Sequence, residues 1–135
     1  RDLAERRRPV IVRTLAGHCV TGPIIAVRAD FVCVRDPRLG DTLMPTPRIL
    51  TVQPTRGDDL QAGDRYHAVV LDFGDALMEL TARRPGVIAG AGDETHRGEL
   101  RTVSTEVVTL TVAGERRESI YIALAAIDYV VVRSR

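Results

Sequence analysis

Arginine is the residue type in this chain whose spacing most suggests a binding chemistry. Three arginines stand together at Arg6, Arg7 and Arg8, and two more stand at Arg83 and Arg84. Guanidinium groups donate several hydrogen bonds to phosphate oxygens, so both clusters are candidates for contacting RNA or single-stranded nucleic acid. The alternative is structural, because each cluster ends a predicted helix, where a cation is stabilised by the helix dipole by about 0.3–1 kcal/mol.

Acidic residues and the overall charge favour the structural explanation of both clusters. Asp2 and Glu5 precede the first cluster, and Glu79 precedes the second. These carboxylates lower the local positive potential. The chain as a whole has a formal net charge of +1, so no global positive field attracts a polyanion. Phosphate contact by the five arginines therefore enters as a hypothesis.

The residues that commonly perform catalysis or bind metal ions form no recognisable motif. The three histidines, His18, His67 and His96, are far apart in the sequence, and no CxxC or HxxxH pattern accompanies them. Cys19 follows His18 directly, but successive residues of a strand point to opposite faces of a sheet. Cys19 and Cys33 are expected to be buried free thiols, too far apart for a disulfide. We therefore expect no enzymatic activity, no metal and no cofactor.

The composition predicts a globular protein with an aliphatic core. The 135 residues are 44% hydrophobic and 27% charged, and they include no Trp. All 19 basic residues are Arg, which indicates a GC-rich genome, most simply that of a high-GC bacterium. No apolar run reaches the roughly 18 residues of a membrane span, and no signal peptide is visible, so we expect a cytoplasmic protein without a membrane partner. The first residue is Arg rather than Met, which predicts that upstream residues are missing.

One segment of the sequence occurs twice. Residues 22–34 (GPIIAVRADFVCV) and residues 98–110 (GELRTVSTEVVTL) lie 76 positions apart and share a leading Gly, a central Val, an acidic residue and an alternating apolar end. Pro9 and Pro85 have the same spacing, and each follows an arginine cluster. The repeat predicts two units of the same architecture.

Each unit is predicted to begin with a short helix that ends at the proline. The second helix is the better defined, because Phe73, Leu77 and Leu80 fall on one apolar stripe. Proline disfavours helical geometry in the residue before it, so Pro85 should end this helix. Within the unit that follows, the glycine of the second strand, Gly98, suits a sharp bend, as Gly22 does in the first unit.

Five short strands are predicted after each helix, because apolar segments alternate with turn residues. In the first unit they are VIVRTL, CVTGPIIAV, FVCVR, TLMPT and RILTV, and in the second GVIAG, THRGELRTV, VVTLTV, ESIYIA and AIDYVVV. The expected boundaries are residues 1–54 for the first unit and 66–135 for the second. Residues 55–65, rich in Gly and Asp, are interpreted as the linker.

This arrangement of strands and glycines resembles the Sm-like (LSm) small β-barrel fold. A turn glycine at Gly17, a second glycine at Gly22 and apolar residues at Ile24 and Val27 resemble the first Sm motif. The resemblance implies a mostly β protein with two tandem Sm-like five-stranded bent-sheet barrels, each preceded by a short α-helix. The chain is also similar to uncharacterised two-repeat proteins of high-GC Gram-positive bacteria.

The residues with which Sm proteins grip uridine-rich RNA are not retained. The family carries Asp six places and Asn ten places after the second glycine, where this chain has Arg28 and Val32 in the first unit and Ser104 and Val108 in the second. The acidic residue stands eight places after the glycine instead, at Asp30 in the first unit and Glu106 in the second, where we expect it to support a hairpin turn. The Arg-Gly pair that closes the second Sm motif is missing from both units.

Two classes of function therefore remain open. In one, the protein is a non-enzymatic Sm-like binding or assembly module that contacts RNA or single-stranded nucleic acid through its arginines. In the other, it is a protein-interaction scaffold that self-associates or pairs its strand edges with a protein partner, without nucleic acid. Residues 121–132 (YIALAAIDYVVV) predict an apolar edge that needs covering. Because Sm-like barrels cover such edges by ring assembly, we expect self-association.

Overall fold

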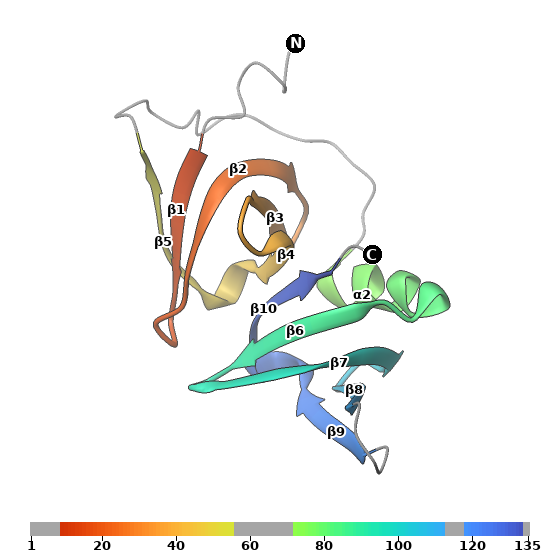
Figure 1. The fold of residues 1–135 in the computed structure, drawn as a ribbon. Helices are drawn as coiled ribbons and strands as arrows, with labels where there is room; N and C mark the ends of the chain where they lie inside the picture. Colours follow the sequence, from red (N-terminus) through yellow and green to blue (C-terminus); the bar gives the residue numbers. More distant parts are fainter. Residues whose placement is uncertain (1–8, 56–71, 113–117, 134–135) are drawn as a thin grey trace.

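A computed structural model describes residues 9–55, 72–112 and 118–133 (Figure 1). The strands are β1 (Pro9–Thr14), β2 (Cys19–Val27), β3 (Phe31–Asp36), β4 (Gly40–Pro45), β5 (Ile49–Pro54), β6 (Gly86–Ala91), β7 (Glu94–Val103), β8 (Val107–Val112), β9 (Glu118–Ala123) and β10 (Ile127–Val132). One α-helix is described, α2 (Phe73–Leu80), with three short 3-10 turns, η1 (Thr46–Arg48), η2 (Thr81–Arg83) and η3 (Leu124–Ala126). The prediction of a mostly β protein is confirmed.

All ten strands belong to one antiparallel sheet, in the order β5-β1-β2-β3-β4-β10-β6-β7-β8-β9. The first five positions and the last five repeat the same internal order, with the fifth strand of each unit placed before its first. In Figure 1 each unit is strongly curved, and the two curved halves meet at β4 and β10. The predicted repeat is therefore visible in the topology of the sheet.

The expectation of two separately closed barrels is not confirmed, because the sheet is open. Strand β4 of the first unit pairs with β10 of the second. The fourth and fifth strands of one unit are therefore not neighbours, neither β4 and β5 nor β9 and β10, and neither unit closes into a barrel. Both are apolar: Leu43 and Met44 of β4, and Val130 and Val131 of β10, are buried. Pairing them with each other hides two apolar strands from water in one step and leaves β5 and β9 as the edges of the sheet.

The glycine bends predicted in the second strands have a steric cause. A Cβ on Gly22 would overlap the carbonyl oxygen of Arg35, and a Cβ on Gly98 would lie 2.7 Å from the carbonyl oxygen of Thr111. The backbones of β2 and β3, and of β7 and β8, thus approach more closely than any side chain allows. Just after each glycine the strand register shifts by one residue, between Ile24 and Ala26 in β2 and at the matching place in β7. This bulge lets each unit curl.

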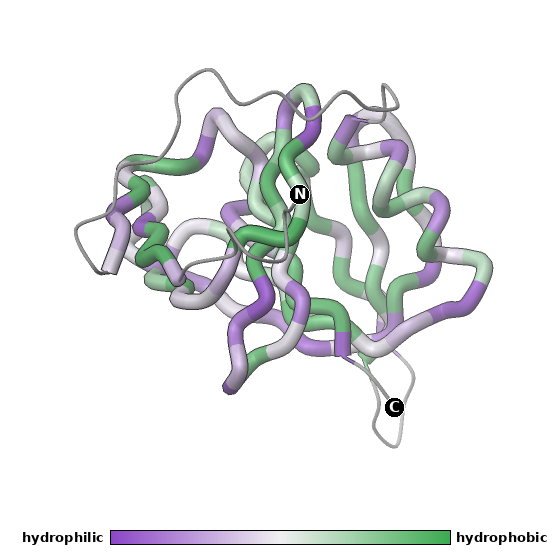
Figure 2. Tube along the Cα trace, turned by 90° about the horizontal axis from the view of Figure 1, so that it is seen from above, coloured by the Kyte–Doolittle hydropathy of each residue, from purple (hydrophilic) through white to green (hydrophobic). Residues whose placement is uncertain are grey.

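The two units share part of one hydrophobic core. The larger core cluster joins α2 to the second unit, through residues such as Phe73, Leu77 and Leu100. Phe31 and Leu43 of the first unit belong to the same cluster. The smaller cluster lies within the first unit, around Val10, Val12, Val20, Val34 and Met44. Figure 2 shows apolar segments running through the interior and hydrophilic ones at the turns.

Helix α2 confirms most of the predicted apolar stripe. Phe73 and Leu77 are buried, and Leu80 is half-buried against the larger core. Asp72 caps the helix, because its carboxylate accepts a hydrogen bond of 2.7 Å from the backbone N–H of Asp75. The helix ends at Leu80, short of Pro85, and continues as η2. The helix predicted before Pro9 and most of the predicted linker lie outside the described residues.

Candidate functional site

The junction between the units is built on three residue pairs of β4 and β10. They are Leu43–Val130, Thr42–Val131 and Asp41–Val132, in antiparallel register. Leu43 and Val130 are buried on the face toward the larger core, and Thr42 is fully buried beside them. The first unit thus offers its fourth strand, and the second unit its fifth.

A buried carboxylate fixes the junction beside this pairing. Asp128 lies at a register shift between Ile127 and Tyr129 and has no exposed surface. Thr14 donates its hydroxyl to one carboxylate oxygen at 2.9 Å, and Arg48 donates its Nε–H to the other at 2.9 Å. A fully buried aspartate needs such partners, because desolvation of an unpaired charge is costly. Both donors come from the first unit, so this aspartate connects the two units.

His18 completes what we call the junction cluster, formed by Thr14, His18, Arg48 and Asp128. The Nε2 atom of His18 lies 3.0 Å from the carbonyl oxygen of Gly92 and 3.8 Å from the Asp128 carboxylate. Its ring also packs edge-on against Tyr129, with the ring centroids 4.8 Å apart. The histidine is therefore occupied in joining the units.

No metal site emerges among the residues that the structure describes. Within these ranges no three side chains of the His, Cys, Asp and Glu types come together as metal ligands would. His96, on β7, pairs with Glu94, its Nε2 atom 2.9 Å from the carboxylate. His67 falls outside the described residues.

The two cysteines differ in environment. Both thiols are free, but the expectation that both are buried is wrong for Cys19, which is exposed at the start of β2, whereas Cys33 is half-buried in β3. Burial, reinforced by the negative charge of Asp41, raises the pKa of the Cys33 thiol to about 11, although Arg35 and Arg28 act in the opposite direction. Because the thiolate is the nucleophile, a raised pKa lowers the nucleophilicity of Cys33 at neutral pH.

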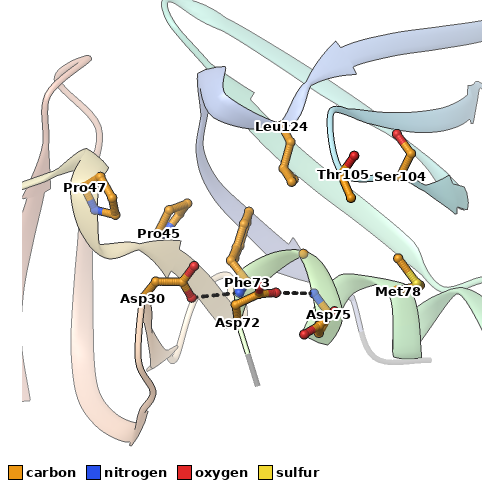
Figure 3. A pocket seen from close by; sticks show the side chains of 11 residues that line it. Asp30, Pro45, Pro47, Asp72, Phe73, Asp75, Met78, Ser104, Thr105 and Leu124 are labelled. Carbon is orange, nitrogen blue, oxygen red and sulfur yellow. Dashed lines mark hydrogen bonds between the residues drawn. The ribbon is translucent and has the colours of Figure 1, made fainter. Parts of the chain in front are cut away.

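A hollow of about 260 Å³ lies at the start of α2 (Figure 3). Its polar groups are largely committed to the backbone: Asp30 accepts a hydrogen bond of 2.8 Å from the N–H of Phe73, and Asp72 caps the helix. The expectation that the Asp30 side chain supports its own hairpin turn is not confirmed, because the hydrogen bond described for its carboxylate goes to the helix of the other unit. The turn itself is closed by a backbone hydrogen bond of 2.8 Å from the N–H of Arg28 to the carbonyl of Phe31.

The predicted arginine site is described only in its second half. Arg6, Arg7 and Arg8 lie outside the described residues. Arg83 ends η2, and Arg84 follows it as a left-handed cap with a φ of 46°. Both side chains are exposed, and neither forms an ion pair with a described residue. Whether the five arginines form one surface therefore stays a prediction, because the structure describes only the second cluster.

The edge strands of the described sheet carry exposed apolar side chains, of which Tyr121 lies in the predicted apolar edge and Leu50 was not singled out by any sequence pattern. Within the described ranges, the large apolar side chains most open to solvent are Tyr121 on β9, 70% exposed, and Leu50 on β5, 61% exposed. The predicted apolar edge of residues 121–132 divides here, because β9 lies at an edge of the described sheet whereas β10 lies in its middle.

A lone Asp within the apolar run AIDYVVV was the only sequence signal of the junction cluster.

Fold and site together define a β protein of two topologically equivalent five-stranded units, joined through a polar junction and open at both sheet edges. Comparison of the chain with family models, with curated proteins and with solved structures finds no match. None of the helices in the described ranges is long and apolar enough to cross a membrane.

Proposed function

We propose that this protein is a non-enzymatic assembly module that acts through the free edge strands β5 and β9. We further propose that its two units are Sm-like barrels, opened where β4 and β10 join them. The repeated strand order and the bulged, glycine-bent second strands support this relationship.

The observation that carries the assembly proposal is a difference in exposure between equivalent positions. Leu43 on β4 is 8% exposed, whereas Tyr121, at the same position of β9, is 70% exposed. The difference matches the strand order, since β4 pairs with β10 whereas no described strand lies on the corresponding side of β9. An edge with unpaired backbone groups and a large apolar side chain is a surface suited to strand pairing.

The described titratable side chains of the junction serve structure. His18 and Asp128 hold the two units together, and Cys33 keeps its proton at neutral pH. Asp30 and Asp72 bind backbone N–H groups at the start of α2. These commitments support a binding role in preference to catalysis.

Lysine substitutions on both edge strands, β5 and β9, test the assembly proposal. The purified wild-type chain is expected to be larger than a monomer in light scattering coupled to size exclusion, whereas the double variant Leu50→Lys/Tyr121→Lys is expected to be monomeric. A lysine on an edge strand opposes pairing because its charge would lose water. Met78→Lys is the matched control, since Met78 is also an exposed apolar residue but lies on α2. A monomeric wild type across the accessible concentration range would contradict the proposal.

A second candidate function is contact with RNA or single-stranded nucleic acid, and the exposed side chains of Arg83 and Arg84, which form no ion pair with a described residue, favour it. Phosphate binding of this kind releases counterions, so the affinity for a fluorescent single-stranded RNA should fall as salt rises. Arg83→Ala/Arg84→Ala is expected to weaken binding about tenfold and to flatten its salt dependence. Arg97→Ala, an exposed arginine of β7, provides the control. Binding that is equal in all three proteins would exclude this site.

A further inference from the structure

The internal junction shows how these units join, and the equivalent strands of the other unit lie at the two ends of the described sheet. At the junction the fourth strand of one unit, β4, pairs with the fifth strand of the other, β10. The free edges are the fourth strand of the second unit, β9, and the fifth strand of the first, β5. We propose that the partner of each edge is a second copy of this chain, with β9 of one copy paired to β5 of the next. This inference rests on the proposed assembly function and specifies its partner.

The correspondence between the units sets the register of this pairing. Strands β4 and β9 each have six residues, and each is followed by a three-residue turn and another six-residue strand. The register shifts agree, since the fifth strand skips Leu50 in its pairing with β1 and Asp128 in its pairing with β6. Transferring the three junction pairs gives Tyr121–Val52, Ile120–Gln53 and Ser119–Pro54. The proline falls in the last pair, where its missing N–H removes at most one ladder hydrogen bond.

The residues at the free edges also supply an apolar counterpart of the junction cluster. Leu50 occupies the position of Asp128, and it would meet Ala91 in place of Thr14 and Ala126 in place of Arg48. A buried acid with polar donors inside the chain is thus matched by an exposed leucine with two small apolar residues at the ends. The position of His18 is held by Glu94, whose carboxylate is engaged by His96.

The difference between the polar junction cluster and the apolar set at the sheet ends favours pairing of β9 with β5 over the alternative pairings. If β10 were to pair with β9 of another copy, Asp128 would be buried against Ala91 and Ala126 without a donor. If β5 were to pair with β4, Leu50 would be placed against the guanidinium of Arg48. Both mismatches leave a buried charge unpaired, which selects against them. The polar cluster therefore marks the junction within a chain, and the apolar set marks the junction between chains.

Pairing of two different edges makes the contact heterologous, which gives a closed ring or an open filament. Single-edge variants test this directly. Leu50→Lys keeps an intact β9, and Tyr121→Lys keeps an intact β5. Each variant alone is expected to be monomeric, whereas an equal mixture is expected to give a heterodimer of twice the monomer mass. Thermal unfolding of each variant close to that of the wild type shows that the charged edges have not disturbed the fold.

Disulfide trapping tests the register. In a Cys19→Ser background, Val52→Cys/Tyr121→Cys places two thiols directly opposite each other across the proposed contact, within disulfide reach. Oxidation should yield a ladder of reducible covalent oligomers. The matched control, Val52→Cys/Ser119→Cys, shifts one thiol by two residues along the same face, beyond that reach, and should give little product. Cys33 can remain, because its thiol is protonated at neutral pH.

The outcomes separate this inference from the proposed function. Single variants that still dimerise alone would show that like edges pair, β5 with β5 or β9 with β9, which overturns the head-to-tail contact but leaves edge assembly standing. An oligomeric wild type that resists the charged edges would overturn both. Equal cross-linking of the matched and shifted cysteine pairs would overturn the register alone.

Discussion

Replacing Gly22 by Ala is expected to lower the free energy of unfolding by about 3 kcal/mol. The new methyl group would overlap the carbonyl oxygen of Arg35, and its carbonyl carbon would lie 2.8 Å away. Both atoms belong to the backbone of β3, so relief requires the separation of two paired strands at their bend. Denaturant unfolding should therefore give a lower free energy of unfolding for the Gly22→Ala variant than for the wild type, and the substitution changes neither the charge nor the cysteines of the protein.

Gly86→Ala is the control for this experiment. Gly86 also lies in a strand, at the start of β6, but a Cβ there would meet no atom within 4 Å. Since alanine lowers the conformational entropy of the unfolded chain, this substitution should be neutral or slightly stabilising. Gly98→Ala should resemble Gly22→Ala, because its Cβ would approach the Thr111 carbonyl oxygen in the second unit. Equal stability of all three variants would show that the close approach of the strands is not a constraint.

Removing the carboxylate of Asp128 is expected to cost about 2–3 kcal/mol in the free energy of unfolding. The Asp128→Ala variant leaves the hydroxyl of Thr14 and the guanidinium of Arg48 without their buried acceptor. The comparison is Asp41→Ala, which removes a carboxylate that also accepts a hydrogen bond from an arginine, Arg35, at 2.8 Å. That pair is exposed to solvent, so its loss should change the free energy of unfolding far less than the loss of Asp128.

A compensating variant makes this prediction sharper. Asp128→Leu combined with Thr14→Ala and Arg48→Ala copies the apolar set Leu50, Ala91 and Ala126 into the internal junction. Replacing a buried polar cluster by apolar residues of suitable size is often close to neutral. We therefore expect the triple variant to be more stable than Asp128→Leu alone, by about 1 kcal/mol or more. If Asp128→Ala unfolds like the wild type, the cluster does not stabilise the junction.

The sequence was sufficient to predict the repeat because the residues that mark it, glycines and spaced apolar residues, are required by local steric and packing constraints. A glycine is required wherever two backbones nearly touch, so Gly22 and Gly98 recur with the bend that needs them. The burial of Phe73 and Leu77 follows from their helical spacing, and the alternation in β8 places Val108 and Leu110 in the core. Each of these features depends on residues that are close together in the sequence.

The union of the two units could not be predicted in the same way. Strands β4 and β10 are both apolar, which shows that each needs a neighbour but not which one. Asp128 forms its hydrogen bonds with Thr14 and Arg48, whose sequence positions are distant from its own, and no spacing rule links them. Leu50 and Tyr121 resemble ordinary strand residues until the sheet order shows that their strands are its edges.

The central place of β10 has a consequence for how the chain folds as it is synthesised. Strand β4 ends at Pro45 and β10 begins at Ile127, so the ribosome adds about 80 residues between them. At roughly 5–20 residues per second, the apolar edge of β4 waits roughly 4–16 s for its partner. A nascent chain in this interval exposes the strand that later lies in the middle of the sheet. The order of translation therefore makes β4 the segment at which binding by a chaperone would best protect the growing protein from aggregation.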